Sequence, residues 1–412
     1  MAKSKSSSHF LRDYEASMSR FTDAPEEYHR AAAYTVFGAG LTKWRYRCIL
    51  HGGVPPRWCN LWVLLIGESG EGRKSTAVRM AEQVLASFDD TLHGPTDGSA
   101  EGFLMDWVKK NRNANKAKGA SDAASILIQP EFSVMLASAE RSYNASLKPI
   151  LTDLYDVPPL FKRTLAKTEW EIPKPRLSML GAIAVEMLPH YTQQVDWLGG
   201  FFNRALLITA QRKRTMARAG TPSDDVMVGH SDALWRVLKA WKHSQFNMGR
   251  PLFDYDKAAA ARVEKLIPRM PKEPNLVATL TRASTHLMKC AAIEQIDADP
   301  TAKSIGVAAV DRAFELIDHW WRTVPDIIDE CFSRDQSDFG GDRLPKRIYR
   351  YCLKHGNVDG WVEYAEVMRA CALNTMMMNS AVDALVLSGM MEKRQDEDEH
   401  QCLWLKAIKR IH

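Results

Sequence analysis

Residues 67–76, GESGEGRKST, carry the clearest chemistry in the chain. Glycines allow backbone N–H groups to turn inward around phosphates, a lysine contacts the outer phosphates, and a hydroxyl holds Mg²⁺. The stretch directly follows an apolar run, 61–66, and opens a helical pattern, which is the setting that such a loop requires. It predicts a site for ATP and Mg²⁺, with Ser75 or Thr76 as the metal ligand. The predicted binding residues are Gly67, Ser69, Gly70, Gly72, Arg73, Lys74, Ser75 and Thr76.

The position of the lysine leaves two interpretations open. Counted as G-x-x-x-x-G from Gly67, the residue directly after the second glycine is Arg73 and not Lys74. Either the loop holds one extra residue and Lys74 contacts the phosphates, or Arg73 takes the place of the lysine. We favour Lys74, because a compact ammonium followed by a hydroxyl is the working arrangement. The alternative for the whole stretch is a glycine-rich turn between strand and helix that binds nothing.

A site that hydrolyses ATP also needs a carboxylate to orient water, on a strand beside the loop strand. Glu131 follows the apolar run 125–128 and is the candidate. Pro130 stands directly before it, so the chain has no Asp-Glu pair here. Mg²⁺ is then expected to rely on a hydroxyl, water and the phosphates, with help from Glu131 or Gln129. The alternative for Glu131 is a solvated acid at the end of a strand.

Four short apolar runs predict the strands that position these residues: 61–66, 125–128, 177–183 and 205–210. Helical patterns lie around them at 76–88, 100–110, 140–155 and 185–197. Continuous apolar runs that alternate with helices indicate an α/β domain with a mainly parallel sheet over 55–215. Residues 1 to about 22 read as a loose polar arm, and the acids and proline at 23–27 predict the start of a helix over 28–50.

The rest of the chain reads as helical and then mixed. Helical patterns at 231–245, 256–267, 275–296 and 307–332 predict an all-helical region, and 337–342 reads as a linker. Helices at 344–355, 364–372 and 375–387, followed by a hairpin from 389 to 404, have the winged-helix order. The predicted divisions are therefore an N-terminal arm and helix (1–54), a core (55–215), a helical lid (216–336) and a winged-helix-like domain (337–412).

Composition excludes several classes of protein. The 412 residues are 45% hydrophobic and 25% charged, with 55 Lys and Arg against 50 Asp and Glu, a net charge of +5. These proportions exclude disordered, collagen-like and coiled-coil chains. No apolar run approaches the ~20 residues that cross a bilayer, so we expect no membrane association and a cytoplasmic location. The seven cysteines form no C-x-x-C pair and are expected to be small buried residues.

Arg204 lies between a helical pattern and the last apolar run, and this order resembles an AAA+ ATPase. The chain is similar in particular to phage- and plasmid-borne primase-associated helicase-like ATPases, over about 28–330. The resemblance implies a ring, expected to be a hexamer, in a bacterial or phage-infected cell. It also implies that Arg204 reaches a neighbouring subunit's γ-phosphate, that Arg282 senses the nucleotide from the lid, and that Glu131 positions water. The alternative for Arg204 is a structural arginine with a capping or salt-bridge role. The stretches that carry it are the loop, 131–132, 151–156, 180–183, 200–204 and 280–284.

The chain departs from that pattern in two places. Pro130 replaces the aspartate of the Asp-Glu pair. Ala184 directly follows the run 177–183, at a position where the family carries a polar residue at the end of its fourth strand. Two polar contacts are thereby lost, so we expect slow turnover or a site that mainly binds.

Three basic patches are candidates for single-stranded DNA, at 109–118, 161–172 and 211–218. The second is expected to form a hairpin. The alternative for each patch is a solubilising surface. The C-terminal domain is a weaker candidate, because the start of its third helix has no lysine or arginine and residues 396–399 are acidic. Met376 to Met378 read as core or as an adaptable contact surface. The predicted DNA-binding residues are Lys162, Arg163, Lys167, Lys116 and Lys118.

The sequence therefore favours a ring-forming, ATP-dependent motor on single-stranded DNA. No primase or polymerase motif is present, so a priming partner would be a separate protein. The alternative is a nucleotide-dependent assembly or loading factor, or a defence-system switch, that binds a protein partner without unwinding. A metabolic kinase is a third and weaker interpretation, since it leaves the winged helix unexplained.

Overall fold

The computed structural model describes most of the chain, in two compact units that are treated separately below, 1–331 and 332–412. The predicted arm and core, and the predicted lid up to residue 331, fall within the first unit. The described residues are 9–43, 47–48, 57–70, 72–94, 100–116, 124–165, 168–192, 196–197, 200–211, 220–248, 252–267, 281–332, 343–357, 359–371, 375–387, 389–395 and 403–408.

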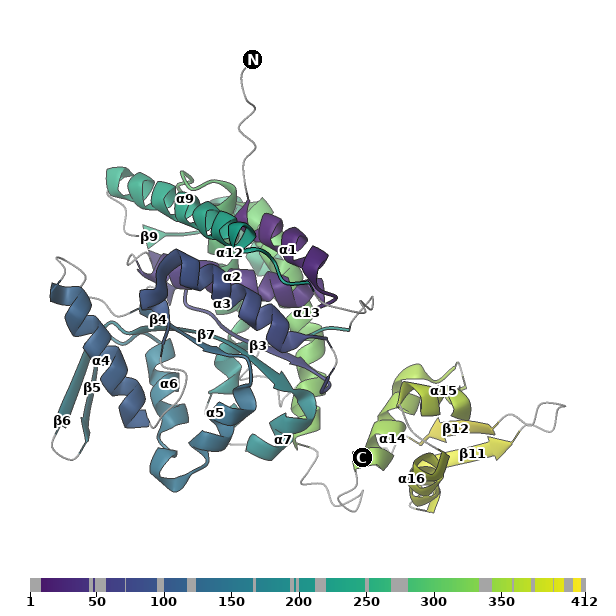
Figure 1. Ribbon diagram of the computed structural model, residues 1–412. Coiled ribbons are helices and arrows are strands. Elements are labelled where there is room, and N and C mark those ends of the chain that lie inside the picture. Colours follow the sequence, from purple (N-terminus) through teal and green to yellow (C-terminus); the bar gives the residue numbers. More distant parts are fainter. Residues whose placement is uncertain are drawn as a thin grey trace. The chain divides into compact units, whose positions relative to one another are not determined.

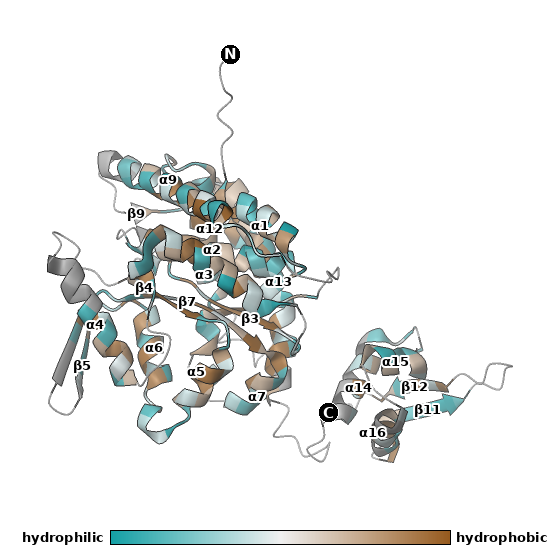
Figure 2. Ribbon diagram, in the orientation of Figure 1, coloured by the Kyte–Doolittle hydropathy of each residue, from teal (hydrophilic) through white to brown (hydrophobic). Residues whose placement is uncertain are grey.

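The first unit is built on a parallel four-stranded sheet with the order β4-β7-β3-β8. The strands are β3 (Trp62–Gly67), β4 (Ala124–Gln129), β7 (Arg176–Ala184) and β8 (Ala205–Thr209). Each predicted apolar run forms one of them, and the predicted α/β domain is confirmed. The runs are continuous because helices cover both faces of the sheet, and the strands are accordingly the most hydrophobic ribbons in Figure 2.

Helices α2 (Glu26–Lys43) and α3 (Lys74–Asp89) cover one face, while α5 (Phe132–Ala139) and α6 (Leu147–Tyr155) cover the other (Figure 1). Helix α2 is buried along almost its whole length, since the sheet lies on one side of it and further helices on the other. Its predicted start is confirmed. The predicted continuation to residue 50 is wrong, because α2 ends at Lys43 and strand β1 (Arg47–Cys48) follows.

The expected loose arm is wrong for its second half, because residues 10–21 form helix α1 (Phe10–Phe21). Phe10, Leu11, Tyr14 and Met18 are buried in its contacts with α2 and α9. These four positions lie on one helical face, and the polar residues between them occupy the other, so the segment looks polar on composition alone.

Two further predicted helices, both in the α/β region, are shorter than expected. In the segment 140–155, residues 142–144 form a 3₁₀ turn, η2 (Ser142–Asn144), and α6 begins only at Leu147. The side chain of Asn144 accepts a hydrogen bond from Ala100 N and donates to Ser138 O, which competes with helical backbone bonds. In 185–197, η3 (Val185–Met187) is followed by a four-residue helix, α7 (Leu188–Tyr191), that begins with Pro189 in its first turn.

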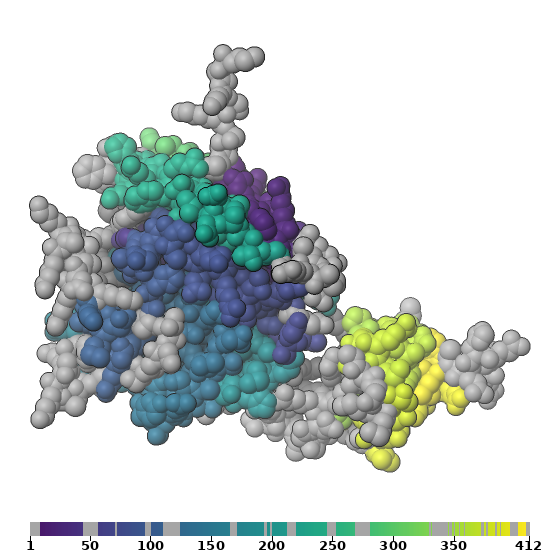
Figure 3. Space-filling view, in the orientation of Figure 1, coloured from purple at the N-terminus to yellow at the C-terminus, as the bar shows by residue number. Residues whose placement is uncertain are grey.

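The remaining helices of the unit pack around these layers. In the space-filling view α9 lies beside α1 (Figure 3). Strand β9 interrupts the region that the sequence predicts to be all-helical, and it joins β1 and β2 in a small sheet of order β2-β1-β9. The elements are η1 (Asp90–Leu92), α4 (Ala100–Lys116), η4 (Phe202–Arg204), β2 (Arg57–Trp58), α9 (Asp224–Met248), β9 (Leu252–Phe253), α10 (Lys257–Leu266), α12 (Ala283–Ala298) and α13 (Val307–Phe332).

The hairpin expected from the basic patch 161–172 is present, directly before β7. Strands β5 (Leu160–Leu165) and β6 (Thr168–Pro173) pair antiparallel, and α4 packs against β6 (Figure 1). Phe161 and Ile172 are partners across the hairpin and are both buried.

The described residues of the second unit form three helices and a three-stranded antiparallel sheet of order β10-β12-β11. Its core includes Ile348, Val367, Met378 and Leu405, so Met378 is core. The predicted linker 337–342 and the acidic stretch 396–399 lie outside the described residues. The elements are α14 (Arg343–His355), β10 (Trp361–Glu363), α15 (Tyr364–Ala370), α16 (Thr375–Leu387), β11 (Met391–Gln395) and β12 (Leu403–Ala407).

Two expectations from composition can be compared with the described residues. Five cysteines there are free and buried, as predicted: Cys59, Cys290, Cys331, Cys352 and Cys371. Within the described ranges, none of the helices combines the length and hydrophobicity needed to cross a bilayer.

Candidate nucleotide site

The loop from β3 to α3 turns sharply at three residues. Gly70, Gly72 and Arg73 have positive φ angles of 74°, 73° and 46°. A side chain is strained in this region, which explains glycine at the first two positions. Gly67 is needed for a different reason, because a Cβ added there would lie 2.8 Å from the hydroxyl of Tyr28. Tyr28, on α2, donates to the backbone oxygen of Ile66 at 2.6 Å and so holds the end of β3.

The structure separates the roles of Arg73 and Lys74. The Nε of Arg73 forms an ion pair with Asp23, a buried carboxylate between α1 and α2. Lys74 is buried, and its Nζ donates to the backbone oxygen of Glu68 at 2.7 Å. The ammonium of Lys74 therefore lies against the loop itself, whereas the guanidinium of Arg73 is turned toward the N-terminal helices.

Ser75 and Glu131 come together beside this loop. The Oγ of Ser75 lies 3.1 Å from Glu131 Oε1 and 2.9 Å from the backbone oxygen of Pro130. Ser75 is therefore the hydroxyl that faces the end of β4. Thr76 is the next residue of the same helical turn, and its amide donates to Arg73 O.

The expected neighbourhood of Glu131 is wrong in one respect. Strand β7 lies between β3 and β4, so Glu131 does not follow a strand adjacent to the loop strand. It still reaches Ser75, because β4 ends at Gln129 and the turn at Pro130 and Glu131 leads toward the first turn of α3.

These groups fit a magnesium nucleotide by their chemistry. An ammonium, a hydroxyl and a carboxylate meet at the N-terminus of α3, whose backbone N–H groups and partial positive charge favour an anion. An added Cβ at Gly70 would meet nothing within 4 Å, so the outer side of the turn is open. Among the described residues no group of three or more His, Cys, Asp and Glu could hold a metal by itself. Any Mg²⁺ here would take its remaining ligands from phosphate and water.

Glu186, in the short turn η3 after β7, contacts the loop and was not among the predicted site residues. Its Oε1 accepts a hydrogen bond from the backbone N–H of Ser69 at 3.3 Å. Ala184 pairs with Gly67 at the ends of β7 and β3, so a residue two positions further on lies next to the loop. The sequence offers one signal, a carboxylate two residues after Ala184, the position identified as a lost polar contact. Only the pairing of β7 with β3 shows that this carboxylate lies at the loop.

A second polar cluster joins the other two predicted arginines. Asp156, at the end of α6, accepts from Arg204 Nη2 at 2.5 Å and from Arg282 Nη1 at 3.3 Å. Arg204 also donates to Gly200 O at 2.7 Å. Burial raises the pKa of Asp156, but the hydrogen bond and charge of Arg204 and the charges of Arg282 and Lys289 outweigh it, so the pKa is lowered. The carboxylate is thus held ionised between two guanidinium groups.

This cluster lies at the opposite end of the sheet from the loop. Arg204 immediately precedes Ala205, which pairs with Trp62, the first residue of β3, and the loop begins after Gly67. Five residues of strand span about 17 Å. Neither Arg204 nor Arg282 therefore lies at the loop of its own chain. For Arg282 this differs from a lid residue that senses the nucleotide of its own subunit.

Lys289 fastens α12 to the same end of the sheet. Its buried Nζ donates to Asn60 O at 2.7 Å and Asn60 Oδ1 at 3.1 Å, and lies 4.0 Å from the centre of the Tyr155 ring. Burial lowers the pKa of this ammonium to about 7. Asp156 thus directly follows a buried residue, Tyr155, that contacts this ammonium.

The predicted DNA-binding residues are only partly described. Lys162 forms an ion pair with Glu171 across the β5–β6 hairpin, with about half of each side chain exposed. Arg163 is half-buried. Lys116 ends α4, further along than the predicted helix, and its side chain lies outside the described residues. Lys167, Lys118 and most of the third basic patch also lie outside them.

A comparison with models of protein families finds no match for the chain, and a comparison with curated proteins finds none either.

Proposed function

We propose that the chain is an ATPase that binds Mg²⁺·ATP, assembles into a ring and moves along single-stranded DNA, as its resemblance to AAA+ motors implies. One observation carries the proposal most of all. Lys74, Ser75 and Glu131 meet at the loop, while Arg204 lies about a strand length away at the opposite end of the same sheet. Such a site is incomplete in one chain and is completed by another.

Each loop residue has a defined task in this proposal. The ammonium of Lys74 exchanges Glu68 O for phosphate oxygens, and the hydroxyl of Ser75 ligates the metal ion. Bound Mg²⁺ neutralises charge that develops on the phosphates. Glu131 Oε1 lies within hydrogen-bond distance of Ser75 Oγ and is placed to orient a water molecule and accept its proton.

Arg204 serves the neighbouring chain. A head-to-tail interface, repeated until it closes, places one end of the sheet against the opposite end of the next copy. The guanidinium then leaves Asp156 and donates its fork of N–H groups to the phosphate that is transferred. Arg282 shares the same carboxylate, so both arginines arrive at the interface together.

The β5–β6 hairpin is the proposed DNA contact. Lys162 and Arg163 lie on β5, and both residues of the Lys162–Glu171 pair are half exposed, so water screens their attraction. A phosphate backbone can therefore replace Glu171 as the partner of Lys162 at little cost.

Replacement of Lys74 tests the nucleotide site directly. We expect Lys74→Ala to abolish ATP binding, measured by calorimetry on the full chain, because the loop loses its phosphate-binding charge. Arg73→Ala is the matched comparison, and it should retain binding because Arg73 pairs with Asp23. Undiminished affinity in Lys74→Ala would contradict the proposal.

A nucleotide-dependent assembly or loading factor is the second candidate. The observation in its favour is the Lys162–Glu171 pair, because it neutralises one of the two positive charges of β5, and β6 carries a second acid, Glu169. Stimulation of ATPase activity by a single-stranded oligonucleotide, weakening as salt rises, supports the motor. ATPase activity that the oligonucleotide leaves unchanged supports the assembly factor.

A further inference from the structure

Glu186 places a negative charge on the nucleotide loop. It belongs to the short turn η3 directly after β7, and its Oε1 accepts the Ser69 N–H at 3.3 Å. The second oxygen of the carboxylate is buried. The side chain is therefore held against the loop by the register of β7 on β3, in which Ala184 lies opposite Gly67.

The backbone N–H groups of such a loop are the donors that bind phosphate oxygens. A carboxylate oxygen and a phosphate oxygen are both anionic acceptors, so they compete for the same donor. We infer that Glu186 is an internal competitor of the phosphate, which occupies the Ser69 N–H in the free chain and is displaced when a nucleotide binds. Glu186 thereby sets the affinity of the loop. This inference rests on the proposed nucleotide site.

The neighbouring contacts distinguish Glu186 from the other loop groups. Lys74 is held by the uncharged backbone oxygen of Glu68, so a phosphate replaces that contact without displacing a negative charge. Glu131 contacts the Ser75 hydroxyl, where a metal ion would compensate its charge. Glu186 alone among these three contacts an N–H of the turn with a carboxylate. Its 3.3 Å bond is slightly longer than the usual range for N–H···O hydrogen bonds, and such a bond exchanges readily.

Removal of the charge should therefore strengthen binding. Glu186→Gln keeps an oxygen acceptor of the same length but removes the repulsion between carboxylate and phosphate. We expect the Kd for ADP, measured without Mg²⁺ by calorimetry on the full chain, to fall about fivefold. The gain should shrink as salt is raised, because salt screens repulsion between exposed charges. Loss of folding cannot produce a gain in affinity.

Glu82→Gln is the matched control. It removes the same charge from α3 at a point eight residues beyond Lys74, about 12 Å along the helix. We expect this variant to bind ADP like the unaltered chain. Equal or weaker binding by Glu186→Gln, alongside measurable binding by the unaltered chain, would overturn the inference and leave the nucleotide site intact. If neither the unaltered chain nor Glu186→Gln binds ADP, the proposed function itself fails.

Discussion

At the scale of single residues, the conformation of the loop from β3 to α3 is explained by what its neighbours exclude. Tyr28 leaves room only for glycine at position 67, and Asp23 draws Arg73 away from the loop. Lys74 is left as the cation that lies against the turn. The loop thus holds one extra residue before Lys74. That residue is Arg73, which has a left-handed backbone conformation and whose charge is paired with Asp23.

Substitution of Glu131 tests its proposed role in ATP hydrolysis. Glu131→Gln should leave ATP binding within about twofold but lower the hydrolysis rate by about 10² or more, because an amide cannot accept the proton of water. Steady-state phosphate release together with calorimetric binding separates the two effects. Glu140→Gln, an exposed change at the end of α5, is the control. A hydrolysis rate that stays unchanged in Glu131→Gln would remove Glu131 from the mechanism.

The loop could be predicted from sequence because its chemistry is local. Glycines, lysine and hydroxyl follow one another within ten positions, and the strand before them is a continuous apolar run. Asp23, Tyr28 and Glu186 could not be found in this way. Asp23 reaches the loop from the segment before α2, Tyr28 from α2, and Glu186 from η3 after β7. Only the packing of the sheet brings these segments together.

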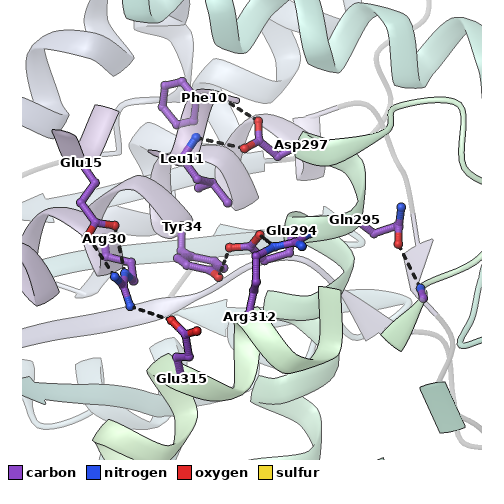
Figure 4. Close-up of polar contacts among 11 residues, drawn as sticks. Phe10, Leu11, Glu15, Arg30, Tyr34, Glu294, Gln295, Asp297, Arg312 and Glu315 are labelled. Carbon is purple, nitrogen blue, oxygen red and sulfur yellow. Dashed lines mark hydrogen bonds and ion pairs between the residues drawn. The ribbon is translucent and has the colours of Figure 1, made fainter. Parts of the chain in front are cut away.

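At the scale of elements, α1 is fastened to the first unit by a carboxylate from α12. Asp297 accepts the backbone N–H groups of Phe10 at 2.8 Å and Leu11 at 3.1 Å, as Figure 4 shows. Two otherwise unpaired donors at the start of α1 are thereby satisfied. Tyr34 on α2 and Arg312 on α13 both contact Glu294, one turn before Asp297 on α12. The N-terminal helices and the later helices therefore form one packed layer, which composition alone did not reveal.

The pH dependence of stability tests this fastening. Burial raises the pKa of Asp297 to about 7, the two backbone hydrogen bonds lower it, and Glu294 and Asp13 raise it further. The unfolded carboxyl ionises near 3.9, so the folded chain binds the extra proton between about pH 4 and pH 7. The stability linked to this proton is full below about pH 4 and is lost as pH rises through 7.

We therefore expect the free energy of unfolding of the unaltered chain to fall between pH 5 and pH 8. This fall should exceed the fall in Asp297→Asn by on the order of 2 kcal/mol. Urea unfolding at the two pH values measures the difference. Asp299→Asn removes an exposed carboxylate two residues away and should keep the full pH dependence. If Asp297→Asn keeps it as well, the carboxylate does not titrate in this range.

At the scale of the whole molecule, the sheet separates the two halves of the proposed site. Alternating apolar runs and helices were enough to predict the α/β class and all four strands of the sheet. These patterns were not enough to predict the order of the strands in the sheet, since that order depends on which strand pairs with which. That order places β7 between β3 and β4, and it places Arg204 and Arg282 with Asp156 at the end of the sheet away from the loop.

Mixing two inactive variants tests the shared site most directly. Lys74→Ala should fail to bind ATP, and Arg204→Ala should bind ATP but not hydrolyse it. In mixed rings the intact loop of an Arg204→Ala chain meets the intact arginine of a Lys74→Ala chain. Random assembly of equal amounts creates that pairing at about one interface in four. We expect hydrolysis, absent in each variant alone, to return to about a quarter of the unaltered rate. An inactive mixture of well-assembled variants, or an Arg204→Ala chain that hydrolyses ATP normally, would contradict it.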